Sequence, residues 1–117
     1  MTIKWSNDDN IIVIRVSGVL TKPEFDACQL EIEPTIQKGQ TKMLILVTDF
    51  QGWGSAVDDW ADLSFQERND PFIRKIAIVG DKKWRDLATM FAGQGLRPFP
   101  IEYFASNQEE FARAWLE

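Results

Sequence analysis

Asp58, Asp59 and Asp62 are acidic residues close enough in the sequence for acid–base or metal chemistry. Asp58 and Asp62 are four positions apart, which puts both carboxylates on one face of a helix, and Asp59 lies beside them. Paired carboxylates can exchange protons with a substrate or hold a metal ion. Acidic side chains are also favoured in the first turn of any helix by the helix dipole, which accounts for all three. We therefore predict neither a catalytic residue nor a metal site among them.

Histidine and cysteine, which many enzymes use as base and nucleophile, are nearly absent. The sequence contains no histidine, which excludes Ser-His-Asp and Cys-His catalysis and histidine-bound metals. Cys28 is the single cysteine, so an intramolecular disulfide and a cysteine-ligated zinc or iron–sulfur site are excluded as well. Neither standard glycine-rich phosphate loop is present, which argues against nucleotide binding. We predict a protein that is not an enzyme and that needs no metal or cofactor.

Aromatic and apolar residues outside the expected core give the clearest functional signal. Trp53 lies in the glycine-flanked stretch 50–54, where no periodicity requires it, and Met90 and Phe99 flank a second glycine-containing loop. Concave apolar binding sites have this composition. Loops that fold down onto the core have it too, so both interpretations stay open. The binding hypothesis places a hydrophobic small molecule or lipid between the second and third helices, with candidate contacts at Trp53, Trp60, Met90, Phe91 and Phe99.

Length and charge narrow the class of protein further. The chain has 117 residues, which is enough for one domain with its own core, and we expect residues 1–117 to form a single domain. The formal net charge of −5 disfavours nucleic-acid binding, which needs a basic face. The sequence begins with no signal-peptide pattern and has no apolar run long enough to span a membrane, so we expect a cytoplasmic location.

Runs of β-branched and aliphatic residues predict five strands. Such runs are too short for helices and are bounded by glycine, proline or polar residues. They cover residues 3–5, 11–16, 43–47, 73–79 and 101–104, and the first two form a hairpin. Pro98 and Pro100 flank the last run and favour an edge position for it.

Apolar residues at three- and four-residue spacing predict four helices. The first begins after Thr21, closes at Gly39 and should be kinked or interrupted by Pro34; its buried stripe is Phe25, Cys28, Ile32 and Ile36. The second begins at Ser55 and ends before Pro71. The third is capped by Asp81, with a stripe of Trp84, Leu87, Ala88 and Phe91. The last is capped by Asn107 and turns Phe111, Ala114 and Trp115 inward.

The predicted element order is ββαβαβαβα. Strands that alternate with helices imply right-handed crossovers and a largely parallel sheet. We predict an α/β domain with a mostly parallel five-stranded sheet, an antiparallel N-terminal hairpin and four helices.

Several local motifs resemble the SpoIIAA-like family, small bacterial proteins with the STAS fold of anti-sigma-factor antagonists. The matching stretches are Thr48–Trp53, Lys75–Trp84 and Glu110–Leu116, and the resemblance covers nearly the whole chain. It implies a STAS-like, non-enzymatic domain. It also implies kinship with the lipid-carrying domains called Sec14 or CRAL-TRIO, which share this topology and bind nonpolar molecules.

The sequence departs from sporulation-type antagonists of this family at one place. Those proteins carry an Asp-Ser-Ser-Gly-like turn after the third strand, and an anti-sigma kinase phosphorylates its serine. Here the stretch Asp49–Ser55 is a longer aromatic loop, with Ser55 near the corresponding place. Ser55 is therefore the candidate phosphorylation site.

Two functional hypotheses follow. The first is a non-enzymatic STAS-like binding module for a nonpolar small molecule or lipid, with peripheral membrane contact as an extension of that role. The second is a regulatory protein that binds a protein partner, as the resemblance to anti-sigma-factor antagonists implies, with or without phosphorylation near Ser55. Copurifying lipid would favour the first, and a neighbouring gene for an anti-sigma kinase would favour the second.

Overall fold

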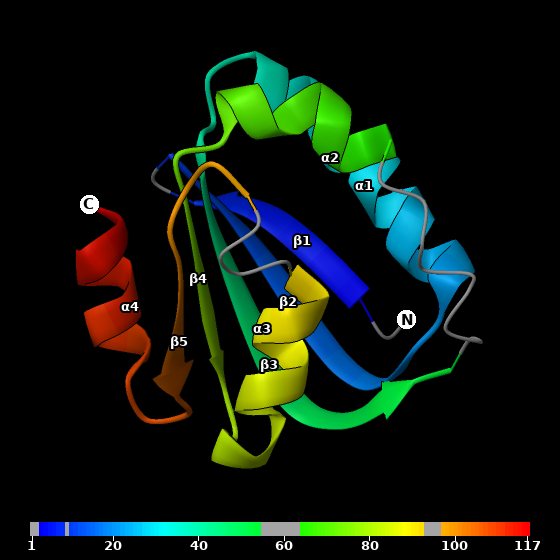
Figure 1. The fold of residues 1–117 in the computed structure, drawn as a ribbon, viewed down its shortest axis with the longest axis vertical. Coiled ribbons are helices and arrows are strands. Elements are labelled where there is room, and N and C mark those ends of the chain that lie inside the picture. Colours follow the sequence, from blue (N-terminus) through cyan, green and yellow to red (C-terminus); the bar gives the residue numbers. More distant parts are fainter. Residues whose placement is uncertain (1–2, 9, 55–63, 93–96) are drawn as a thin grey trace.

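Five strands and four α-helices make up the part of the chain that the computed structural model describes, residues 3–8, 10–54, 64–92 and 97–117 (Figure 1). The strands are β1 Ile3–Asp8, β2 Ile11–Leu20, β3 Lys42–Trp53, β4 Lys75–Gly80 and β5 Ile101–Ala105. The helices are α1 Lys22–Gln37, α2 Ser64–Asn69, α3 Arg85–Ala92 and α4 Glu109–Leu116. Two short 3-10 helices, η2 Asp70–Phe72 and η3 Lys82–Trp84, precede β4 and α3.

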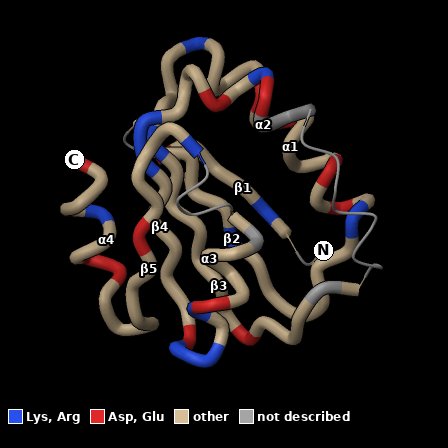
Figure 2. The backbone as a smooth tube through the Cα atoms, in the orientation of Figure 1, with Lys and Arg blue, Asp and Glu red and all other residues tan. Residues whose placement is uncertain are grey.

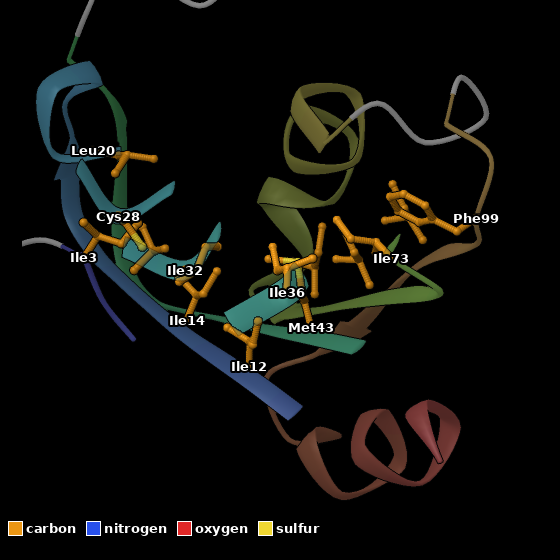
Figure 3. Packing of buried hydrophobic residues seen from close by; sticks show 14 of the residues in the cluster. Ile3, Ile12, Ile14, Leu20, Cys28, Ile32, Ile36, Met43, Ile73 and Phe99 are labelled. Atoms are coloured by element: carbon orange, nitrogen blue, oxygen red, sulfur yellow. The ribbon is translucent and has the colours of Figure 1, made fainter. Parts of the chain in front are cut away.

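The strands form one sheet in the order β1-β2-β3-β4-β5. β1 pairs antiparallel with β2, and each later pair is parallel. α1 and α3 lie over one face of this sheet and α4 covers the other (Figure 3). The α/β fold with an antiparallel hairpin, a mostly parallel five-stranded sheet and four helices is therefore confirmed.

Each face of the sheet has its own apolar cluster because successive strand residues point to opposite sides. In β2, Ile12 and Ile14 point into the cluster beneath α1 and α3, whereas Ile11 and Val13 point into the cluster beneath α4. Figure 3 shows the larger cluster, with Leu20 and Cys28 toward one end and Phe99 at the other. Burial on both faces explains why the central strands read as continuous aliphatic runs rather than alternating ones.

Helix α1 confirms its predicted stripe. Cys28, Ile32 and Ile36 are buried, and Phe25 packs against the same cluster while remaining partly exposed. The chain leaves the helix through Gly39, whose φ of +118° is a conformation that only glycine adopts readily. Pro34 lies inside α1 without ending it, since the helix continues to Gln37.

The predicted end of the third strand is wrong. Residues 50–53, expected in a loop, continue β3 and pair with β2, where Gly18 opposes Phe50 and Leu20 opposes Trp53. Asp49 has a φ of +50° and the β2–β3 register shifts at Gly18, so the strand bends there and runs on. β2 is likewise longer than expected and ends at Leu20.

The predicted inward face of the last helix is also wrong in part. Ala112 and Leu116 are the buried residues of α4, whereas Phe111 is 67% exposed and Ala114 is exposed. Trp115 does pack against the cluster. The cap is Gln108 rather than Asn107. The small side chain of Ala112, in the same cluster as Ala77, lets the helix approach the sheet on this face.

Cys28 should react very slowly with thiol reagents in the native protein. It is buried, and burial, with a smaller contribution from the nearby Glu31 charge, raises the pKa of its thiol to about 11. Because the thiolate is the reactive form, labelling at pH 8 should be at least about a hundredfold slower than in denaturant. The measurement is the rate of reaction with a chromogenic disulfide in native buffer and in urea. Equal rates would contradict the burial of this face of α1.

Candidate functional site

The five residues predicted to contact a nonpolar ligand have different positions in the fold. Trp53 ends β3 and Phe91 lies in α3, but their side chains are outside what the structure describes. Met90 is on α3 and exposed, and Phe99 is buried at one end of the larger core cluster (Figure 3). Trp60 lies outside the described residues, as does the candidate phosphorylation site Ser55 and the predicted start of the second helix.

Helix α3 presents apolar side chains to solvent. Met90 is 72% exposed and Leu87, three residues earlier on the same side of the helix, is 49% exposed. The sequence predicted Leu87 in the buried stripe; instead Thr89 is buried, and its hydroxyl donates to the carbonyl of Arg85 at 2.7 Å. The helix therefore combines core contacts on one side with an uncovered apolar pair on another.

An ion pair between Arg97 and Asp70 links the segment after α3 to the segment after α2. The single Nε–H of Arg97 donates a hydrogen bond that is shared between the two oxygens of the Asp70 carboxylate, at 3.1 Å each, and Nη2 donates a further short one. Arg97 Nη1 also donates to the carbonyl of Ala92 at the end of α3, and its guanidinium lies 4.6 Å from the centre of the Phe99 ring. No local pattern in the sequence signals this pair, because its members are far apart along the chain.

A second polar contact, centred on Glu33, links α2 to α1. Glu33 accepts hydrogen bonds from Arg68 Nε at 2.8 Å and from the fully buried Asn69 at 2.6 Å. These two hydrogen bonds, that of Arg68 first, hold the pKa of the Glu33 carboxyl below its usual value. The contact is thus present with Glu33 ionised and weakens as the pH falls through that lowered pKa.

The carboxyl ends of the paired stretches of β3 and β4 line a cavity of about 390 Å³, the size of a small-molecule pocket. The two strands pair only as far as Leu46 and Val79, after which β3 bends away with β2 (Figure 1). Ligands of open parallel sheets bind beyond these ends. The lining combines apolar side chains (Leu46, Val47, Phe50, Val79 and Trp84), hydroxyls (Thr48 and Ser106) and charges (Arg15, Asp49, Asp81, Lys83 and Glu109).

Several of the lining groups already have structural roles. Asp81 accepts a hydrogen bond from the backbone N–H of Lys83 at 3.0 Å, which confirms its predicted capping role, although the turn that it begins is η3. Glu109 accepts one from Arg113 Nε at 3.0 Å. Trp84 packs edge-on against Phe50, with ring centres 4.9 Å apart. Burial, followed by the charge of Asp81, raises the pKa of Tyr103, whose hydroxyl donates to the Asp81 carbonyl.

Comparison with protein families shows to which family the chain belongs. A family model described as SpoIIAA-like matches residues 11–117, which is most of the sequence. This chain belongs to the SpoIIAA-like family. No curated protein matches it. In this SpoIIAA-like chain, as far as the described residues go, no helix is long and apolar enough to cross a membrane.

Solved structures share the SpoIIAA-like fold. An uncharacterized protein from Shewanella loihica PV-4 with a SpoIIAA-like fold is 21% identical, with a TM-score of 0.72 over 98% of this chain and 92% of that one. The Bacillus cell fate determinant SpoIIAA, in its phosphorylated form, is 17% identical, with a TM-score of 0.58 over 96% of this chain and 98% of that one. At these identities the likeness concerns the fold.

The cavity of this SpoIIAA-like domain is not among the sites predicted from the sequence. Asp49 and Asp81 lie two positions after the predicted strands 43–47 and 73–79, so the rule that ligands bind beyond the carboxyl ends of parallel strands could have found them. No local sequence signal points to Arg15, which lies in the middle of β2 and reaches the cavity only because that strand pairs with β3 at Leu46. Ser106 and Glu109 were missed because they come from the far end of the chain.

Proposed function

We propose that this SpoIIAA-like domain is a non-enzymatic binding module that holds a nonpolar small molecule or the hydrocarbon chain of a lipid between its second and third helices. The observation that carries the proposal is the exposed apolar pair of α3, Leu87 and Met90. Trp53, Trp60, Phe91 and Phe99 stay in the proposal as the contacts that the sequence suggests.

Energetics favour a ligand at this helix. Each methylene removed from water yields about 0.8 kcal/mol, and an exposed methionine offers a flexible apolar surface that adapts to different ligand shapes. α3 is held at its far end by the Arg97 contact to the Ala92 carbonyl, so its exposed side belongs to a positioned helix. A ligand would thus meet a preformed apolar surface, which lowers the ordering cost of binding.

The lack of histidine and the single, buried cysteine support a non-enzymatic role. The sequence has no histidine, and the high pKa of the buried Cys28 thiol makes it a poor nucleophile. The described part of the chain also contains no group of three or more acidic or cysteine side chains placed to hold a metal ion.

Saturated fatty acids of increasing length should change the tryptophan fluorescence of this protein saturably. Affinity should rise by about fourfold for each added methylene and then level off when the site is full. Met90→Gln should weaken binding severalfold, since it places an amide where the chain would lie, and should barely change the melting temperature because Met90 is exposed.

Leu30→Gln is the matched control for that experiment. Leu30 is 64% exposed on α1, so the substitution removes a comparable apolar surface from another helix. Equal losses in the two variants would mean that the fatty acid adsorbs without a site. No saturable change with any chain length would overturn the proposal, and binding to vesicles without binding to free fatty acid would replace it by peripheral membrane contact.

A regulatory role with a protein partner is the second candidate. The likeness to the phosphorylated Bacillus cell fate determinant favours it, and Ser55 is the candidate phosphorylation site that the sequence resemblance suggests. Mass spectrometry of the protein isolated from its own cells tests this role. A phosphate on the peptide that contains Ser55 would support it, and the unmodified peptide under all growth conditions would count against the phosphorylated form of the hypothesis.

A further inference from the structure

The sheet divides at its carboxyl edge. Leu46 and Val79 are the last paired residues of β3 and β4. Beyond them β3 follows β2 while β4 ends at Gly80, where an added Cβ would lie only 3.0 Å from the Cβ of Val47. The strands therefore touch at Gly80 and separate directly after it, so the cavity of about 390 Å³ lies where β3 no longer pairs with β4.

Charged groups of both signs line this cavity. Figure 2 shows basic and acidic residues side by side at this end of β3 and β4. Glu109 is already paired with Arg113, Asp81 caps η3, and the Lys83 ammonium lies 5.7 Å from the centre of the Trp84 ring. Asp81 and Lys83 have these contacts but no ion pair among the described residues, and two further charged residues of the lining have no such contact at all.

Arg15 and Asp49 are those two charges. Within the described residues, neither takes part in an ion pair, and both side chains belong to exposed residues that line the cavity. Arg15 offers a planar fork of donors that suits a carboxylate. Asp49 offers an acceptor that suits an ammonium group. The hydroxyls of Thr48 and Ser106 can add hydrogen bonds to a ligand, and Leu46 and Val79 provide an apolar part of the lining.

We propose that this cavity binds a small zwitterion such as a free α-amino acid, with its carboxylate on Arg15 and its ammonium on Asp49. A simple anion could pair with Arg15 but would leave the Asp49 carboxylate without a partner. A metal ion does not fit, because no cluster of three acidic ligands exists among the described residues. A ligand that carries both charges satisfies both side chains, and its aliphatic part lies against Leu46 and Val79.

This site is separate from the proposed nonpolar site. It uses the carboxyl edge of the sheet and the side of β2 that faces α4, and it shares no residue with the candidate contacts on α3. Failure of either proposal therefore leaves the other intact.

Isothermal titration calorimetry with the standard free amino acids tests the site. At least one aliphatic amino acid should bind saturably, and propionate and propylamine, which carry one charge each, should bind at least tenfold more weakly. Arg15→Gln and Asp49→Asn should each lower the affinity at least tenfold. Asparagine tolerates the positive φ at position 49, so the second variant keeps the backbone.

Lys4→Gln is the control. Lys4 is the exposed cross-strand neighbour of Arg15 on β1 and is not part of the cavity, so this variant changes the charge by the same amount and should leave binding unchanged. The proposal is overturned if no amino acid gives a saturable signal. It is equally overturned if the single-charge analogues bind as tightly, or if Lys4→Gln weakens binding as much as Arg15→Gln.

Discussion

Replacing Arg97 by methionine should lower the free energy of unfolding by about 3–5 kcal/mol, because it strands the Asp70 carboxylate without its partner. Arg97 and Asp70 are only 10% and 14% exposed, so water cannot replace the lost hydrogen bonds fully. The variant also loses the contact to the Ala92 carbonyl and the stacking on Phe99. Urea unfolding followed by circular dichroism measures the change.

A double-mutant cycle shows whether the effect comes from the pair. Asp70→Ala combined with Arg97→Met should cost clearly less than the sum of the two single changes, because the double variant leaves no unpaired charge. Asp26→Ala is the control, since it removes the exposed i,i+4 pair with Lys22 and should cost about 0.5 kcal/mol. Additive losses at positions 70 and 97 would show that the two side chains act independently.

Leu116→Ala should destabilise the protein by about 2–5 kcal/mol, whereas Phe111→Ala on the same helix should change its stability by no more than about 0.5 kcal/mol. Leu116 is 0% exposed and packs in the cluster beneath α4, while Phe111 is 67% exposed. The substitution at Leu116 removes buried methyl groups and leaves a cavity. The same urea titration distinguishes the two variants.

The comparison tests the face on which α4 docks. The sequence pattern placed Phe111 inward, so that prediction expects the larger loss at Phe111. A larger loss at Phe111 than at Leu116 would mean that α4 is rotated relative to the packing described above. Equal and small losses would mean that α4 contributes little to the core.

Parts of the candidate sites were accessible to sequence reasoning and parts were not. Local spacing was enough to select Met90 as an apolar residue near a loop, and it lies exposed on α3. Spacing was not enough to distinguish it from Phe99, which is buried in the core. Both residues are apolar and lie beside the same glycine-containing stretch, so their different exposure depends on the layer above the sheet rather than on neighbours in the chain.

Local sequence patterns were sufficient to predict which segments become strands and which side of α1 is buried. The aliphatic run at 11–16 can bury its apolar side chains only if both faces of the sheet are covered. The spacing of Cys28, Ile32 and Ile36 matches one side of a helix. These outcomes depend on residues within a few positions of one another, where the periods of helix and strand are decisive.

The length of β3, the side of α4 that packs on the sheet and the lining of the cavity depend on contacts between distant segments. β3 continues to Trp53 because β2 supplies hydrogen-bond partners there, and Arg97 finds Asp70 across 27 positions of sequence. The lining of the cavity likewise includes both Arg15 and Glu109, which are far apart in the sequence. Each of these contacts forms when segments that are distant in the sequence pack against one another. A local sequence pattern does not indicate which distant residue a given residue will contact.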